Sequence, residues 1–127
     1  MSRVVLDSSA VLAAIGREPG AEKVMSLRPV AAMSTVNLAE VHGKLIERGF
    51  PSGDAWEAAT SFVQEIIPFD SEQAMAAGAL VTFTRTLGLS LGDRACLALA
   101  QVLGAPVYTS DRDWTKLNAG VSVHLIR

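Results

Sequence analysis

Short continuous apolar segments alternate with helical segments along the whole chain, and this alternation limits its fold more than any other feature. Strands are expected at residues 3–6, 30–33, 66–69, 106–109 and 121–126. Helices are expected between them, at 8–16, 21–27, 35–48, 54–64, 71–87, 91–103 and 112–117. Apolar runs without polar alternation are typical of strands buried on both faces of a parallel sheet. The sequence therefore predicts an α/β sandwich around a parallel sheet.

The length and composition predict a single domain with surplus apolar surface. A chain of 127 residues can bury a substantial core, so we expect one domain over residues 1–127. Half of the residues are hydrophobic and 19% are charged, which suggests a surface covered by a partner or a second copy. The single cysteine excludes an internal disulfide and fits a reducing cytoplasm. No segment is long and apolar enough to predict a membrane span.

Acidic residues interrupt the apolar sequence at three places. Asp7 follows the first apolar segment, Asp93 lies near the start of the apolar helix 91–103, and Asp111 follows the fourth expected strand. A carboxylate at the edge of a buried segment is costly unless it is paired, hydrogen-bonded or metal-bound. In parallel sheets ligands bind beyond the carboxyl ends of the strands, so we expect Asp7 and Asp111 at one edge. Acids gathered there would repel each other and require a cation.

Each of these acids also has a purely structural interpretation. Asp7 and Asp111 are suited to N-cap the helices that follow them. Residues 90–93 resemble a capping box, with Asp93 in the first turn of its helix. That helix is apolar nearly all round and Asp93 lies along its apolar stripe, so a solvated surface position does not explain this residue.

Glu40 is a weaker candidate on periodicity alone. It falls at the polar margin of the helix 35–48, where it is expected at the surface with Lys44 as its partner four residues later. All of the candidate ligands are hard carboxylate oxygens, and no Cys or His cluster is present. This donor chemistry selects Mg²⁺ or Mn²⁺ over zinc.

Four segments in order give the chain a resemblance to a known family. They are Val-Leu-Asp-Ser-Ser-Ala at 5–10, Ser-Thr-Val-Asn-Leu-Ala-Glu-Val at 34–41, Ser-Leu-Gly-Asp-Arg-Ala-Cys-Leu-Ala-Leu-Ala at 90–100 and Thr-Ser-Asp-Arg-Asp-Trp at 109–114. Together they resemble the PIN-domain ribonucleases, and among these the VapC-type toxins of toxin–antitoxin modules. The resemblance covers essentially the whole chain and makes Glu40 the acid of the second segment.

The resemblance implies a three-layer α/β/α sandwich with a mostly parallel sheet of about five strands. It implies a Mg²⁺- or Mn²⁺-dependent endoribonuclease that cleaves RNA phosphodiesters with a metal-activated water, as the toxin of a type II toxin–antitoxin module. One or two ions would be held by Asp7, Glu40, Asp93 and Asp111. Asp7 and Asp93 are the expected direct ligands, and the other two acids bind through water or orient the nucleophile.

Further residues near these acids are candidates for supporting roles. Ser9 and Thr109 are expected to fix the carboxylate orientations, and Asp113 is a candidate fifth acid. The net charge of −2 gives no overall attraction for nucleic acid, so RNA would be contacted by local groups of the 11 Lys and Arg residues. Contact with RNA phosphates and a solvated surface charge are equally good interpretations for each basic residue near the acids, Lys44, Arg94, Arg112 and Lys116.

The resemblance also implies partners, namely an RNA substrate, a cognate antitoxin and a second copy of the chain in a cytoplasmic homodimer. Two alternatives remain open. One is a PIN nuclease of RNA processing or DNA repair without a toxin role, and the other is a PIN-like interaction module that has lost catalysis. The intact set of acids argues against the inactive module, and a small antitoxin gene immediately upstream would identify the toxin.

Overall fold

Five short strands form one parallel sheet in the computed structural model of the protein, which describes residues 2–127. The strands are β1 (Val4–Leu6), β2 (Ala31–Ser34), β3 (Glu65–Ile67), β4 (Val107–Thr109) and β5 (Val123–Leu125). Their order across the sheet is β3-β2-β1-β4-β5, and each neighbouring pair runs parallel. The predicted parallel sheet of about five strands is therefore confirmed.

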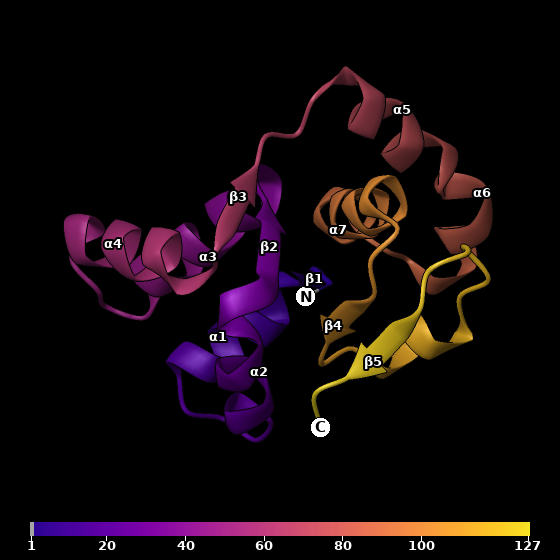
Figure 1. Cartoon of the computed structure of the whole chain (residues 1–127). Helices are drawn as coiled ribbons and strands as arrows, with labels where there is room; N and C mark the ends of the chain where they lie inside the picture. Colours follow the sequence, from indigo (N-terminus) through magenta and orange to yellow (C-terminus); the bar gives the residue numbers. More distant parts are fainter. Residues whose placement is uncertain (1) are drawn as a thin grey trace.

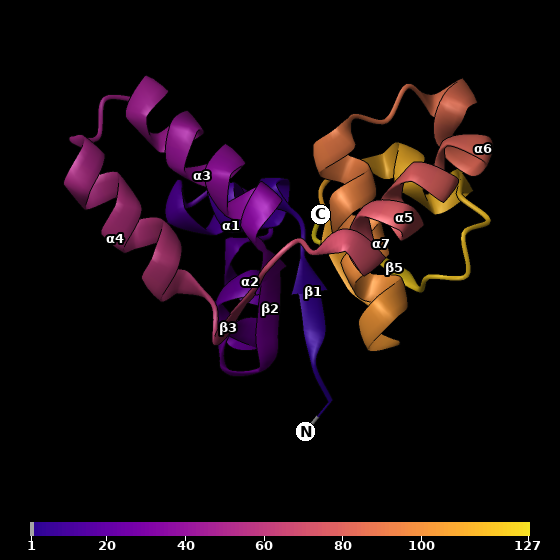
Figure 2. The same ribbon diagram turned by 90° about the horizontal axis from the view of Figure 1, so that it is seen from above.

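Helices cover both faces of this sheet and complete the predicted three layers (Figures 1 and 2). One layer contains α1 (Ser8–Ile15), α2 (Ala21–Leu27), α3 (Thr35–Glu47) and α4 (Ser52–Phe62). The other contains α5 (Ser71–Ala79), α6 (Val81–Thr84) and α7 (Leu91–Leu103). Short 3-10 turns η1 (Arg28–Val30), η2 (Arg85–Leu87) and η3 (Arg112–Lys116) connect these elements. No helix within residues 2–127 is long and apolar enough to cross a membrane.

The central strand β1 divides its side chains between the two helical layers. Val4 and Leu6 pack in the hydrophobic cluster of α1–α4, whereas Val5 packs in the cluster of α5–α7. This follows from the alternation of side chains along a strand. From β1 the chain moves outward through β2 to β3 and then returns to β4 on the other side of β1. That reversal makes the carboxyl end of β1 the topological switch point, where ligands bind in sheets of this kind.

Helix α7 is the most deeply buried helix and carries Asp93 in its first turn. Ser90 caps its start and Gly104, in the left-handed conformation, ends it. The six consecutive residues 95–100 are buried against the sheet and the helix α5. Cys96 is among them and packs as a small core residue.

Several predicted boundaries are wrong. The helix expected at 71–87 is divided into α5, α6 and η2. The guanidinium of Arg94 donates a hydrogen bond to the Ala77 carbonyl close to the end of α5, at 3.0 Å. Because the Ala77 carbonyl accepts this side-chain bond, it is less available to the next turn of its own helix, and the predicted helix is divided there. The strand predicted at 66–69 is β3, which ends at Ile67, and the helix predicted at 112–117 is the 3-10 turn η3.

Candidate active site

Asp7 lies directly after β1, and its carboxylate is held by two hydroxyl groups. Its Oδ2 accepts hydrogen bonds from Ser9 Oγ at 2.7 Å and from Thr109 Oγ1 at 2.9 Å. Asp7 occupies the N-cap position of α1, but its side chain makes no capping hydrogen bond. The cap interpretation of its side chain is therefore wrong, and the carboxylate is directed to the hydroxyls of α1 and β4 instead.

The environment of Asp7 opposes its negative charge. The side chain is only 5% exposed, and this burial raises the pKa of Asp7 from 3.8 to about 6. The two hydroxyls lower the pKa, whereas the negative charges of Asp93 and Glu40 raise it further. Burial is the largest of these influences, so Asp7 is a carboxylate whose desolvation outweighs its two hydrogen bonds, and the neighbouring charges add a smaller contribution.

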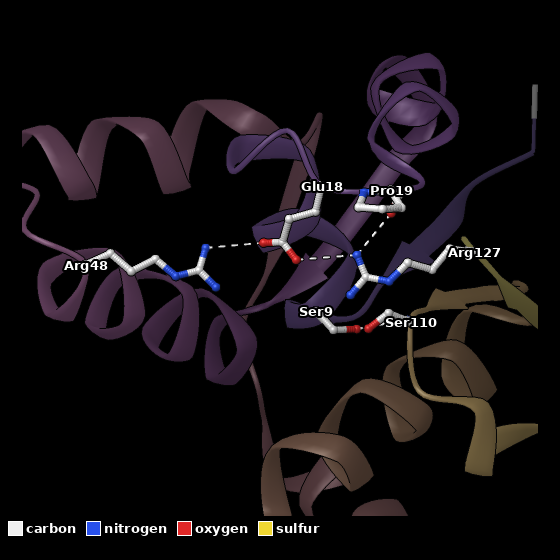
Figure 3. Close-up of polar contacts among 6 residues, drawn as sticks. All are labelled: Ser9, Glu18, Pro19, Arg48, Ser110 and Arg127. Carbon is white, nitrogen blue, oxygen red and sulfur yellow. Dashed lines mark hydrogen bonds and ion pairs between the residues drawn. The ribbon is translucent and has the colours of Figure 1, made fainter.

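The same hydroxyls connect Asp7 to the loop after β4. The backbone N–H of Ser110 donates to Ser9 Oγ at 3.0 Å, and the N–H of Asp111 donates to Thr109 Oγ1 at 3.1 Å. Figure 3 shows Ser9 and Ser110 side by side. Ser9 and Thr109 therefore contact the Asp7 carboxylate and also hold the backbone that leads to Asp111.

Asp111 is exposed and caps the turn η3. Its Oδ1 accepts the N–H of Asp113 at 2.9 Å, so the cap interpretation holds for this acid. Asp113 is also exposed, and its carboxylate forms an ion pair with Lys116 at 3.2 Å. Within the described chain, Asp113 has a basic partner and Asp111 has none.

Glu40 lies on α3, and two donors hold its carboxylate. Its Oε1 accepts hydrogen bonds from Ser8 Oγ at 2.6 Å and from Asn37 Nδ2 at 2.9 Å. Lys44 pairs with Glu47 at 3.1 Å, so the expected pairing of Glu40 with Lys44 is wrong. The backbone of Gly92 lies against the Glu40 carboxylate so closely that a Cβ there would overlap it.

Asp93 takes part in the capping box that the sequence indicates. Ser90 N–H donates to Asp93 Oδ2 at 3.0 Å, and Asp93 N–H donates to Ser90 Oγ at 3.1 Å. Burial raises the pKa of Asp93, the bonds to Ser90 lower it, and the charges of Glu40 and Asp111 raise it. The capping role and the proximity to other acids are therefore both present.

The structure brings the four predicted acids into one cluster at the carboxyl edge of the sheet. The charges of Asp93 and Glu40 both act on Asp7, and those of Glu40 and Asp111 act on Asp93. None of the four forms an ion pair with any residue of the chain that the structure describes.

Another acid shows the usual alternative to such unpaired charge. Glu18 lies between two arginines, at 3.6 Å from Arg48 and 3.4 Å from Arg127 (Figure 3). Arg127 also donates to the Pro19 carbonyl at 3.0 Å. This fold can therefore neutralise a carboxylate with arginine, and it does not do so in the acidic cluster.

The carboxylates of the cluster do not form a closed coordination shell for a metal ion. No group of three or more His, Cys, Asp or Glu side chains among residues 2–127 is placed to hold a metal ion as it stands. Hydroxyl or backbone amide donors engage an oxygen of each acid instead. The free donor oxygens are hard, and they fit an ion that keeps part of its water shell better than one enclosed by protein.

The basic residues near the acids have different environments. Arg94 is half-buried and bonded to the Ala77 carbonyl, and Lys44 and Lys116 are paired with Glu47 and Asp113. Arg112 is exposed and has no side-chain hydrogen bond or ion pair within residues 2–127.

Sequence reasoning missed three residues that support Glu40, namely Ser8, Asn37 and Gly92. Asn37 precedes Glu40 by three residues, which places both on one face of α3, and this spacing could have indicated it. The contacts of Ser8 and Gly92 with Glu40 join different elements of the fold. No spacing within the sequence could have indicated them.

Comparisons with known proteins agree with this fold. The model of the PIN domain family matches residues 4–120. No curated protein sequence matches the chain. A toxin–antitoxin complex from Klebsiella pneumoniae aligns with a TM-score of 0.75 at 19% identity, over 98% of each chain. DNA-bound VapBC from Salmonella typhimurium aligns with a TM-score of 0.76 at 15% identity, over 100% of each chain.

A third solved structure is VapC20 of Mycobacterium tuberculosis, a sarcin-ricin loop cleaving toxin. It aligns with a TM-score of 0.73 at 21% identity, over 89% of this chain and 93% of that one. At such identities the likeness of the three structures establishes the fold.

Proposed function

The chain belongs to the PIN-domain family, and on that premise we propose that it is a divalent-metal-dependent endoribonuclease and the toxin of a type II toxin–antitoxin module. The observation that carries the proposal is the cluster of Asp7, Glu40, Asp93 and Asp111. These acids act on one another electrostatically, and within residues 2–127 no basic side chain neutralises them. A bound cation would offset the repulsion among carboxylates clustered in this way.

The donor chemistry of the cluster fits Mg²⁺ or Mn²⁺. Asp7 and Asp93 would bind one or two such ions directly, and Glu40 and Asp111 would bind through water or orient the attacking water. Mg²⁺ commonly keeps several waters, so it needs few direct carboxylates. When bound, the ion lowers the pKa of water and offsets charge that develops on the phosphate.

The surrounding residues prepare the carboxylates for this role. Ser9 and Thr109 both bond to Oδ2 of Asp7 and leave the other carboxylate oxygen free to coordinate an ion. Ser8 does the same for Glu40 by occupying its Oε1. Exposed Arg112, on the turn after Asp111, is the basic residue best placed to contact an RNA phosphate.

The toxin role is supported by the relatives in fold and by the surface. Structures alike over nearly their whole length include toxin–antitoxin complexes and a loop-cleaving toxin. Large apolar side chains are exposed on α5, α6 and α7, with Met75 at 74%, Phe83 at 55% and Leu91 at 54%. A protein partner, either an antitoxin or a second copy in a homodimer, would cover such side chains. The antitoxin would present an Arg or Lys to the acids.

RNA cleavage by purified protein tests the catalytic proposal. We expect cleavage with Mg²⁺ or Mn²⁺ and none with a chelator, and sequencing of the new 5′ ends would identify the sites. Asp93→Asn should lower the rate by about 100-fold or more, because a lost ligand removes several kcal/mol of charge stabilisation. Ser90 remains the N-cap of α7 and the Asn side-chain oxygen can still accept the Ser90 N–H, so the fold should remain.

The matched control is Asp54→Asn, an exposed acid in the first turn of α4 outside the cluster. It should cleave RNA at the wild-type rate. Wild-type cleavage by Asp93→Asn would refute the site. A chain that cleaves RNA but has no small inhibitory protein encoded beside it would be a PIN nuclease of RNA processing or DNA repair.

A further inference from the structure

Asn37 connects the two helical layers at the acidic cluster. It lies on α3, is fully buried, and donates through Nδ2 to two acceptors, Glu40 Oε1 at 2.9 Å and the Gly92 carbonyl at 3.0 Å. Both partners accept, so the amide nitrogen and not the oxygen must face them. Among the described residues, the bond to Gly92 is the one side-chain hydrogen bond that joins α3 to α7.

Gly92 completes this contact from the side of α7. Its backbone lies against the Glu40 carboxylate, and a Cβ at this position would overlap both carboxylate oxygens. The next residue in the chain is Asp93. The Asn37 amide therefore fixes one acid of the cluster relative to the backbone that carries another.

We propose that Asn37 is a positioning residue, which holds Glu40 at the distance from Asp93 that the metal-dependent reaction requires. The inference rests on the proposed nuclease function. Without the amide, Glu40 would keep only the Ser8 hydroxyl, and α3 would lose its side-chain bond to α7. Productive geometry tolerates displacements of well under 1 Å. A displaced Glu40 should therefore affect kcat more than KM.

The test compares Asn37→Ala with a control that matches its burial and chemistry. Gln73 on α5 is also a buried amide, 3% exposed, and its Nε2 donates to the Pro68 carbonyl at 3.0 Å. The Asn37 Oδ1 and the Gln73 Oε1 are both buried without a hydrogen-bond partner. Asn37→Ala and Gln73→Ala should therefore lose comparable stability, and only the first should alter the site.

The kinetics of RNA cleavage and the affinity for Mn²⁺ should distinguish these variants when both are measured below their melting temperatures. For Asn37→Ala we expect kcat for RNA cleavage to fall about tenfold or more, with KM changed less than about threefold. Its affinity for Mn²⁺ alone, measured by calorimetry, should fall several-fold. Gln73→Ala should retain the wild-type kcat and Mn²⁺ affinity.

A second comparison asks whether Asn37 acts through Glu40. In a Glu40→Gln background, Asn37→Ala should cause no further loss of kcat or of Mn²⁺ affinity, because residues that act as a unit are not additive. An equal loss in both backgrounds would overturn the proposal, as would a loss of stability with kcat and Mn²⁺ affinity unchanged.

The Mn²⁺ measurement also separates this inference from the proposed function. Suppose that wild type binds Mn²⁺, that Asn37→Ala weakens this binding only when Glu40 is present, and that no RNA is cleaved. This result would refute the nuclease function and leave the positioning role of Asn37 intact. RNA cleavage in which Asn37→Ala has the same effect with and without Glu40 would refute the positioning role alone. A protein that neither binds Mn²⁺ nor cleaves RNA would overturn both.

Discussion

The acidic cluster has a buried half and an open half, and the two are built differently. The buried half is Asp7, which is 5% exposed and held by two side-chain hydroxyls at the end of the central strand. The open half consists of Glu40 within α3, Asp93 in the first turn of α7 and Asp111 just before η3, and these three acids are more exposed to solvent. Asp93 and Asp111 also cap their helical turns.

This difference separates stability from activity. A buried carboxylate near other negative charges destabilises the metal-free fold, whereas a carboxylate that caps a helix contributes to it. Both halves are expected to serve the same reaction. Substitutions in the buried half should therefore change stability and activity together, and substitutions in the open half should mainly change activity.

The largest effect on stability is expected for Asp7→Asn. The rise in the pKa of Asp7 from 3.8 to about 6 corresponds to about 3 kcal/mol of destabilisation at neutral pH. An asparagine carbonyl can accept the same two hydroxyls without the charge. The variant should therefore melt about 10 °C higher than wild type at pH 7 without metal, while it loses RNA cleavage.

Asp111→Asn is the matched control in the open half, because asparagine caps as well as aspartate. Its melting temperature should stay close to that of wild type. An Asp7→Asn protein less stable than wild type would contradict the distinction between the two halves.

A smaller effect, on activity, is expected for Gly92→Ala in the open half. The added Cβ would overlap the Glu40 carboxylate and displace it, so kcat should fall about tenfold. Gly43→Ala on α3 is the control, since nothing lies within 4 Å of its added Cβ. Alanine favours both helices by up to about 1 kcal/mol, so neither change should unfold the protein. Equal activity of the two variants would show that the position of Glu40 is unimportant.

The smallest effect is a pH dependence of the metal-free protein. Because the folded-state pKa of Asp7 is raised, its protonation stabilises the fold fully below pH 3.8, and this stability is lost as the pH rises through about 6. The advantage of Asp7→Asn over wild type should therefore shrink by about 1 kcal/mol from pH 7 to pH 5. Denaturant unfolding at both pH values measures it, and a constant advantage would refute the raised pKa.

The sequence predicts the local features of this molecule well. The bounds of α2 and α7 match the predicted 21–27 and 91–103, because clear stop and cap residues flank both helices. The order of strands and helices along the chain was also predictable from apolar patterning. Asp7 and Asp111 were predictable as neighbours, because the carboxyl ends of parallel strands share one edge of a sheet.

Tertiary contacts explain what the sequence could not predict. The division of the helix expected at 71–87 coincides with the bond from Arg94 to Ala77, seventeen residues apart in sequence. Periodicity placed Glu40 at the surface, where it lies, but only the family resemblance assigned it to the site. The contacts from Ser8 and Gly92 that hold Glu40 depend on how separate elements pack.

The central claim is that the unpaired charge of the cluster is reserved for a divalent cation. Thermal unfolding with and without Mg²⁺ or Mn²⁺ tests it most directly. In wild type, either ion should raise the melting temperature, by an amount that corresponds to about 3 kcal/mol at one hundred times Kd. The shift should disappear in the quadruple variant Asp7→Asn, Glu40→Gln, Asp93→Asn, Asp111→Asn. A wild type without a shift, or a quadruple variant with the full shift, would contradict the claim.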